Sequence, residues 1–485
     1  MSEFQRSIRE HLTSASHLNK RHVHPRLQQM FELAGLDAVF DKAEGPWLWD
    51  DQGNRYLDLL AGGGVHFIGR NHPKVLQALR DVMSMDLPNM SVVNASPLGG
   101  ILADRLIALT EDRFSKVIFA NSGSEANEVA LRFARQVTGR RRYLYLDGAF
   151  HGRSYGAISV CGFPEMRERA EPLMPTCTPI RPNDLAALRR ELRYEDVAAL
   201  IVEPIQGMTG LPLDRAWLRE AENLCTQHGT LLIVDEVQTG LARTGSWFSS
   251  LGQGVRPHMM TLSKSLSGGM VPVAALMVAQ DVYDRVYSKF GSGLVYFSTF
   301  AENNLAMAAG IATLDVLEEM DAPAEAERKG ALLREALLDT ARRCDVIDRI
   351  DGRGLMQTIY FRDSANPLLA AQQRVLEATD ASAFAAAVHV EMFRTQRILT
   401  QIPGPGVNAI KVLPPLVTSD EELLGFVSAL EETLTRFARP SAGPVVSLAQ
   451  GAAQSAARKI SSMIPATAAP ALMNGIASLA EKKNL

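Results

Sequence analysis

The stretch TLLIVDEVQTG, residues 230–240, decides the fold. Its apolar run has no polar alternation and ends at Asp235, which is typical of a strand buried on both faces of a parallel sheet. Three further runs have the same character: KVIFA (116–120), RYLYL (142–146) and AALIVEP (198–204). The segment LDRAWLREAENLCTQHG (213–229) has apolar residues at helical spacing. Strands that alternate with helices predict an α/β fold with a mainly parallel, doubly wound sheet.

Small and polar residues follow three of these strands. They are NSGSEANE after 116–120, DGAFHG after 142–146 and DEVQTG after 230–234. The carboxyl ends of parallel strands meet at one edge of a sheet, where open α/β sheets bind their ligands. We therefore expect one crevice to collect all three segments.

The two ends of the chain have a different pattern. Residues 44–60 predict an antiparallel hairpin around the turn DDQGN. After residue 305 the sequence predicts helices, among them 305–320, 329–344 and 420–438, with a strand candidate at 354–361. We expect residues 1–75 and 330–438 to form a smaller α+β domain beside a large domain of residues 76–329.

The last segment, 439–485, is rich in Ala, Ser, Gly and Pro. Such a composition buries too little apolar surface for a core, which predicts a flexible, low-complexity tail. An alternative is a weakly amphipathic helix that contacts a partner or a membrane surface. Its apolar positions would be Val446, Ala449, Ala453, Ala456, Ile460 and Met463.

Composition restricts the class of protein. The 485 residues are 46% hydrophobic and 21% charged, with a net charge of -4, which is typical of a globular protein and argues against a nucleic-acid partner. The four cysteines form no CxxC pair, so we expect neither a disulfide scaffold nor a metal site. The charged N-terminus and the absence of a long apolar run predict a cytoplasmic protein without a spanning helix.

Two side chains point to chemistry. An unpaired carboxylate at Asp235 would be costly at the end of an apolar strand, so it needs an Arg, a helix terminus or a protonated pyridine nitrogen. Lys264, in MMTLSKSLSGG (259–269), could form a Schiff base with an aldehyde, or could simply extend to solvent. The segment NSGSEANE would offer backbone N–H groups to a phosphate, or could only cap its helix.

Seven motifs together give the chain a family resemblance. They are SGSEANE, GAFHG, VEPIQG, DEVQTGLARTG, LSKSLSGG, STFAEN and IKVLPPL, in this order. From about residue 20 to about residue 437 the chain resembles the class III aminotransferases, the ornithine and ω-amino-acid group of fold type I pyridoxal-phosphate enzymes. The resemblance implies an aspartate aminotransferase-like fold, a homodimer, and pyridoxal 5'-phosphate as cofactor.

Carried over to this chain, the resemblance implies a complete cofactor site. Lys264 would form the Schiff base and move the proton, and Asp235 would bind the ring nitrogen. The remaining positions are Gly123 and Ser124 at the phosphate, Phe150 and Val237 at the ring faces, Gln238 at the phenolic oxygen, and His151 and Glu203 behind the ring. His151 is alternatively a structural histidine. Thr299 would reach the phosphate of the neighbouring subunit, which implies at least a dimer.

Two departures from the family concern the substrate. Relatives often have Glu at the position of Met208 and Arg at that of Lys411, a pair that receives a substrate α-carboxylate. Met208 cannot form it, and Lys411 lacks the bidentate geometry of Arg. We therefore expect the donor to be a primary amine, diamine or ω-amino compound and the acceptor a 2-oxo acid or aldehyde. The alternative is that Lys411 still binds α-carboxylates. Glu302 and Asn304 also replace the family's Gly and Pro.

Other functions remain open at this point. An aminomutase, a decarboxylase or a phospho-lyase of the same family would use the same cofactor residues. A non-catalytic regulator that senses the cofactor would usually carry a helix-turn-helix domain, and the first 40 residues are too short for one.

Overall fold

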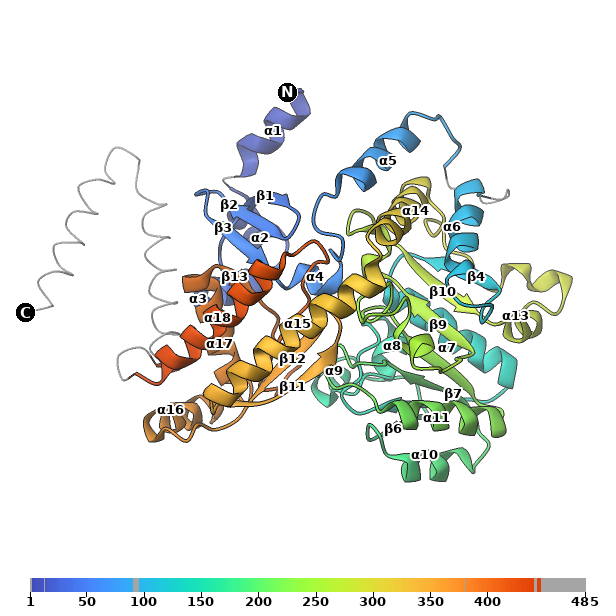
Figure 1. The fold of residues 1–485 in the computed structure, drawn as a ribbon. Coiled ribbons are helices and arrows are strands. Elements are labelled where there is room, and N and C mark those ends of the chain that lie inside the picture. Colours follow the sequence, from blue (N-terminus) through green and yellow to red (C-terminus); the bar gives the residue numbers. More distant parts are fainter. Residues whose placement is uncertain (1, 13, 90–95, 379, 440–442, 446–485) are drawn as a thin grey trace, which may run out of the picture.

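A seven-stranded sheet forms the centre of the protein. The structure, a computed structural model, describes residues 2–439 and 443–445 apart from 13, 90–95 and 379. The strand order is β4-β10-β9-β8-β7-β5-β6 (Figure 1). The strands are β4 (Lys116–Ala120), β5 (Arg142–Leu146), β6 (Cys177–Ile180), β7 (Val197–Val202), β8 (Leu231–Asp235), β9 (Met259–Leu262) and β10 (Ala274–Val278). All neighbours pair in parallel except β10, which is antiparallel to β4 and β9. The predicted mainly parallel α/β sheet is therefore confirmed.

The continuous apolar runs are explained by cover on both faces of this sheet. Along β8, Ile233 packs into one hydrophobic core while Leu232 and Val234 pack into another. Helices α7 (Gly123–Thr138) and α14 (Asn304–Glu319) contribute side chains to the first core. Helices α10 (Leu185–Leu192) and α11 (Arg215–Gln227) contribute to the second, so β8 buries both of its faces.

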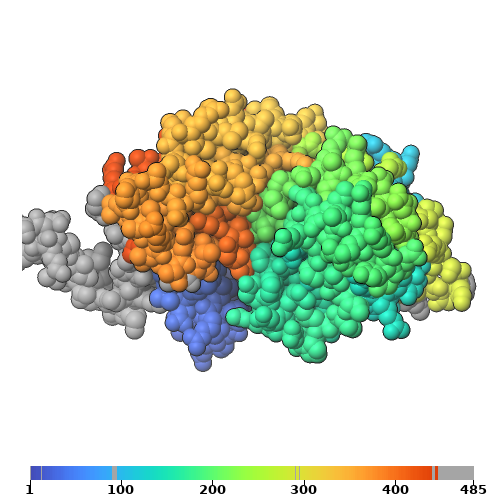
Figure 2. All heavy atoms as spheres, turned by 90° about the horizontal axis from the view of Figure 1, so that it is seen from below, coloured from blue at the N-terminus to red at the C-terminus, as the bar shows by residue number. Residues whose placement is uncertain are grey.

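A separate core joins both ends of the chain. The predicted hairpin forms from β2 (Trp47–Asp50) and β3 (Arg55–Asp58), between β1 (Phe40–Glu44) on one side and β13 (Ile398–Leu399) on the other. A three-stranded antiparallel sheet lies nearby, with β11 (Ile347–Arg353), β12 (Met356–Phe361) and β14 (Ala409–Val412). Helices α15 (Ala322–Arg343), α16 (Pro367–Glu377), α17 (Ala383–Gln396) and α18 (Asp420–Phe437) complete this part. Figure 2 shows its orange and red segments as one mass beside the green and cyan one.

The proposed domain borders stay a prediction. Helix α15 runs without interruption through residue 330, where the sequence suggested a border. The other helices of the described chain are α1 (Glu3–Leu12), α2 (Ala15–His22), α3 (Pro25–Ala34), α4 (Ala61–Gly64), α5 (Pro73–Met83), α6 (Pro97–Ala108), α8 (Tyr155–Ser159), α9 (Pro164–Glu168), α12 (Ser249–Gly252), α13 (Gln280–Val286), and the short 3₁₀ helices η1 (Lys264–Ser267) and η2 (Phe290–Leu294). The tail expected at 439–485 lies outside the described residues except for 439 and 443–445. Within the described chain, no helix has the length and apolarity needed to cross a membrane.

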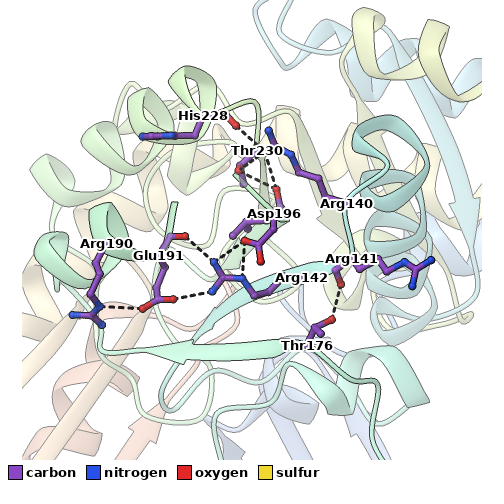
Figure 3. Close-up of polar contacts among 10 residues, drawn as sticks. Arg140, Arg141, Arg142, Thr176, Arg190, Glu191, Asp196, His228 and Thr230 are labelled. Atoms are coloured by element: carbon purple, nitrogen blue, oxygen red, sulfur yellow. Dashed lines mark hydrogen bonds and ion pairs between the residues drawn. The ribbon is translucent and has the colours of Figure 1, made fainter. Parts of the chain in front are cut away.

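Two arginine side chains, those of Arg140 and Arg142, connect the segments at the amino ends of the parallel strands (Figure 3). Arg140 donates from Nη1 to the carbonyl oxygens of Val197 at 3.2 Å and His228 at 2.7 Å, just where β7 and β8 begin. Arg142 pairs with Glu191 and Asp196, each at 2.8 Å. These contacts lie at the edge of the sheet opposite the carboxyl ends of the strands, so they stabilise the scaffold and leave the other edge open for a site.

Candidate active site

A cavity of about 580 Å³ lies at the carboxyl ends of the central strands. Its wall comes from the segments that directly follow β4, β5, β7, β8 and β9, together with Gly63, Val65 and Gln401 from the parts of the chain that flank the sheet. The cavity brings together ten residues that the sequence singled out: Gly123, Ser124, Phe150, His151, Glu203, Met208, Asp235, Val237, Gln238 and Lys264. The one crevice expected from the sequence is therefore present.

Asp235 is held as a carboxylate by three N–H groups. Its Oδ2 lies 2.8 Å from Nδ1 of His151 and accepts a hydrogen bond from Nδ2 of Asn127, also at 2.8 Å. Its Oδ1 accepts from the backbone N–H of Val237 at 3.0 Å. Burial by itself would raise the pKa of Asp235, but the bond to His151 and that residue's charge hold it below the usual value. The protein partners of Asp235 are thus a histidine, a side-chain amide and a backbone N–H, and not the Arg or the helix terminus that the sequence suggested.

His151 lies in the wall of the cavity and is 2% exposed. Burial alone would lower the pKa of His151, but the bond to Asp235 and its negative charge raise it. The ring nitrogen Nε2 is buried and has no hydrogen-bond partner within the described chain. Among the described residues, the only polar contact of the His151 ring is with Asp235, so this side chain acts through that carboxylate.

Asn127 was missed by the sequence reasoning. It lies on α7, is 1% exposed, and its Nδ2 donates to both Asp235 and the carbonyl oxygen of His151. Its Oδ1 accepts from the hydroxyl of Thr261 on β9 at 2.9 Å. The available signal was an amide one helical turn after Gly123, on the face of α7 that is otherwise apolar.

Lys264 has the properties of a reactive amine. It follows β9 with φ at +41°, a left-handed conformation that is strained for a residue with a side chain. Within the described chain, its ammonium has no hydrogen-bond or ion-pair partner. Burial lowers the pKa of Lys264, and the buried cation of Arg243 adds to that effect, while Asp235 opposes it. A lowered pKa increases the fraction of neutral amine, the form that attacks a carbonyl carbon.

The first residues of α7 pack closely against Val237 and leave their backbone N–H groups free at the cavity. A Cβ atom at Gly123 would lie 2.8 Å from Cγ2 of Val237, so a larger residue would displace that side chain. The backbone N–H groups of Gly123 and Ser124 are the first two of the helix and have no intrahelical acceptor. They line the cavity at the positive end of the helix, where an anion is favoured. The hydroxyl of Ser124 accepts from the N–H groups of Arg153 and Ser154, both at 3.1 Å.

Glu203 organises the segments around the cavity. Its Oε2 accepts from the N–H of Phe150 at 3.0 Å, and its Oε1 accepts from the N–H of Gly207 at 2.7 Å. Burial raises the pKa of Glu203. The carboxyl group thus connects the segment that carries Phe150 to the one that carries Met208.

These residues fit pyridoxal 5'-phosphate. The partner-free amine of Lys264 suits its aldehyde, the ionised Asp235 suits a protonated ring nitrogen, and the free N–H groups at Gly123 suit its phosphate. Within the described residues no cluster of His, Cys, Asp and Glu side chains is arranged to hold a metal ion.

Two of the predicted residues do not line the cavity. Lys411, on β14, is fully buried behind it and donates from Nζ to the carbonyl oxygen of Gly207 and to Oε1 of Gln238, the latter at 2.9 Å. Thr299 is exposed on the segment between η2 and α14, so its role in a neighbouring subunit stays a prediction. Met208 does line the cavity and packs with Phe150 against an apolar cluster.

The comparisons with known proteins show the family to which the chain belongs. A family model described as Aminotransferase class-III matches residues 33–434. The chain is 31% identical over 439 residues to Aminotransferase PigE of a Serratia species. The matched region covers 84% of this chain and 52% of that protein, so the chain spans about half of that relative's length. It is 34% identical over 397 residues to the acetylornithine aminotransferase of Bacillus cereus, covering 81% of this chain and 94% of the relative.

Solved structures show the same similarity. The ornithine aminotransferase of Toxoplasma gondii superposes with a TM-score of 0.72 at 28% identity, over 82% of this chain and 90% of that one. An amine transaminase from an uncultivated Pseudomonas species, solved in its PLP-bound form, superposes with a TM-score of 0.71 at 29% identity, over 82% of this chain and 95% of that one.

Proposed function

Because the chain belongs to the class III aminotransferases, we propose that it is a member whose preferred amino donor carries no carboxylate next to the reacting carbon. It is a pyridoxal-phosphate-dependent enzyme that transfers an amino group from an amino compound to a carbonyl acceptor. The proposed donors are a primary amine, a diamine or an ω-amino compound. The proposed acceptor is a 2-oxo acid or an aldehyde.

The roles proposed for the cavity residues follow from their positions. The bound cofactor supplies an aldehyde that takes up the amino group and a ring that accepts an electron pair from the donor's reacting carbon. Lys264 would hold that aldehyde and afterwards carry a proton from the reacting carbon, which its lowered pKa allows. Asp235 would keep the ring nitrogen protonated, since His151 and Asn127 stabilise its charge.

One observation supports the proposed donor class most directly. Among the described residues, Lys264 is the only lysine or arginine that lines the cavity. The ammonium of Lys411, at the family's arginine position, already bonds to Gly207 and Gln238. Apart from Lys264, which the cofactor would occupy, a substrate α-carboxylate therefore meets no cation among the described residues of this wall, whereas Met208 and Phe150 offer an apolar surface.

Three donors of equal chain length test this proposal: hexylamine, 6-aminohexanoate and 2-aminohexanoate. Each is mixed with the holoenzyme without acceptor, and the rate at which the cofactor becomes aminated is followed by its absorption. We expect hexylamine or 6-aminohexanoate to react fastest and 2-aminohexanoate slowest. A faster reaction with 2-aminohexanoate than with either of the other two donors would overturn the proposal, and a spectrum that returns to its starting form would indicate a decarboxylase or lyase.

We also propose that the active unit is at least a dimer, in which Thr299 completes the neighbouring site. The exposed side chains of Phe297 and Phe300 support this, since an apolar surface beside Thr299 suits a subunit contact. Mixed dimers of the Lys264→Ala and Thr299→Ala chains test it, because one of their two sites would contain both native residues. Recovery of activity on mixing is expected, and no recovery despite exchange of subunits would contradict it. A cytoplasmic location remains a proposal that rests on composition alone.

A further inference from the structure

Lys411 is a buried cation bonded to two residues of the cavity wall. Its side chain is 0% exposed, and its Nζ donates to the carbonyl oxygen of Gly207 and, at 2.9 Å, to Oε1 of Gln238. Both of these residues line the cavity, as does Gln401, which exchanges two backbone hydrogen bonds with Lys411. Lys411 thus lies one layer behind the wall that a substrate would touch.

The contact with Lys411 decides which way the Gln238 amide points. The two ends of a glutamine amide have nearly the same shape, so the chain's packing alone does not separate oxygen from nitrogen. Burial and the neighbouring charge of Lys264 lower the pKa of Lys411 to about 7, and Glu203 opposes this effect. The charged form of Lys411 only donates, so the amide end beside it has to be the oxygen. The other end, Nε2, donates to the carbonyl oxygen of Gly63 at 2.7 Å. The reverse orientation would oppose N–H to N–H at Lys411 and oxygen to oxygen at Gly63.

We propose that Lys411 is a positioning residue that fixes the Gln238 amide so that it presents an N–H, and not an oxygen, to the phenolic oxygen of the cofactor. Lys411 is then not an anchor for a substrate carboxylate. The amide nitrogen carries two hydrogens, and Gly63 takes one of them, which leaves the second for the cavity that Gln238 lines. This inference rests on the placement of the cofactor ring proposed above, but not on the proposed donor class.

An N–H aimed at the phenolic oxygen favours its ionised form. The visible absorption of the bound cofactor would change with the loss of the proton that its phenolic oxygen shares with the nitrogen of Lys264, so the pH of this change responds to a hydrogen bond at that oxygen, with no donor or acceptor present. Removing the ammonium leaves only the carbonyl oxygen of Gly63 to orient the amide, so the amide turns over more readily and directs its oxygen at the cofactor for a larger fraction of the time. The titration should therefore move to higher pH, and the affinity of the apoenzyme for pyridoxal 5'-phosphate should fall.

The central experiment is a double-mutant cycle of Lys411→Met and Gln238→Leu, with the titration of the cofactor's absorption as readout. Lys411→Met should shift the titration upward by roughly 1 to 2 pH units, the size expected for one hydrogen bond to the charged form. The same substitution in the Gln238→Leu background should cause no further shift, because no amide remains to be oriented. Lys411→Arg, which retains donors, should restore most of the native value.

A matched control separates positioning from general loss of stability. Lys329 is also buried, at 8% exposure, and its Nζ donates to the carbonyl oxygen of Leu416 at 2.7 Å, away from the cavity lining. Lys329→Met should lower the melting temperature without moving the titration. If Lys411→Met does not fold, Lys411→Gln serves in its place. The amide introduced at position 411 can both donate and accept, so the titration of the cofactor's absorption should shift upward by a smaller amount.

Two outcomes would overturn the proposal. The first is a native titration in Lys411→Met, and the second is a shift that persists fully when Gln238 is leucine. In the first case, at least a tenfold rise in KM for 2-oxo acids but not for amines would identify Lys411 as a carboxylate anchor. Failure of the donor comparison alone would leave this inference standing, since the titration needs no donor.

Discussion

The side-chain amide of Asn127 donates to the same oxygen of Asp235 that His151 contacts, and both distances are 2.8 Å. The other oxygen, Oδ1, accepts from the backbone N–H of Val237 at 3.0 Å. A carboxylate oxygen can accept two hydrogen bonds, so Oδ1 keeps capacity for the ring nitrogen of the cofactor. The arrangement orients Asp235 and keeps it charged before any cofactor binds.

Asn127→Ala should weaken both the binding of the cofactor and the turnover. The substitution removes a hydrogen bond to a buried charge, which typically corresponds to about 1.5 to 3 kcal/mol, or about 10- to 100-fold in rate or affinity. The cofactor dissociation constant and single-turnover rates measure these effects. Asn223→Ala on the exposed face of α11 is a suitable control. A native affinity and rate in Asn127→Ala would show that His151 alone is sufficient.

Asp235→Asn should retain the covalent link to the cofactor but abstract the donor's proton slowly. A neutral amide cannot stabilise the protonated ring nitrogen, and loss of such an electrostatic partner costs on the order of a hundredfold or more in rate. Stopped-flow amination with the best donor gives the rate, and the visible band of the resting enzyme reports the covalent link. Turnover within a few fold of the native enzyme would argue against the assignment.

Lys264→Ala should abolish turnover while the protein still folds and binds the cofactor non-covalently. The N–H groups at Gly123 and Ser124 and the carboxylate of Asp235 are unchanged, so the phosphate and the ring keep their contacts. The visible band that reports the Schiff base should disappear. If the band survives dialysis unchanged, another lysine holds the cofactor.

Gly123→Ala should disturb the start of α7, because the new methyl group would collide with the side chain of Val237. The new Cβ would lie 2.8 Å from Val237, and overpacking of this kind typically costs about 1 to 3 kcal/mol. We expect the affinity for pyridoxal 5'-phosphate to fall. Adding Val237→Ala should recover part of this loss, because it removes the clashing methyl groups. A double variant as weak as Gly123→Ala would place the clash elsewhere.

Buried histidines should make the protein sensitive to acid. Burial lowers the pKa of His389 and of His258 from 6.5 to about 4. Between these values the unfolded chain binds protons that the folded chain does not, so the free energy of unfolding falls as the pH drops from 6.5 towards 4. Calorimetry at pH 7 and pH 5 should show a smaller loss for His389→Gln than for the native protein. The exposed His22→Gln should behave like the native protein.

The sequence by itself determined the sheet and the chemical content of the site. The uninterrupted apolar run before Asp235 predicts a strand covered on both faces, and the polar residues after each strand predict where the cavity lies. The spacing of apolar residues along a strand and the polar residues that end it are local properties of the sequence, so they can be read before the chain folds. The sequence did not identify β6, β9 and β10, because runs such as MMTL (259–262) are too short to distinguish from other buried segments.

Only the tertiary structure decided which polar groups meet. Lys411 and Gln238 are 173 positions apart, and Asn127 and Asp235 are 108 apart. Residues so distant are brought together by the packing of whole elements, as when the pairing of β13 with β3 joins both ends of the chain in one sheet. The residues next to Lys411 in the sequence do not predict that its side chain will be buried and bonded to other residues of the protein. The folded chain decides this, because a fully buried ammonium is stable only where acceptors such as Gly207 and Gln238 surround it.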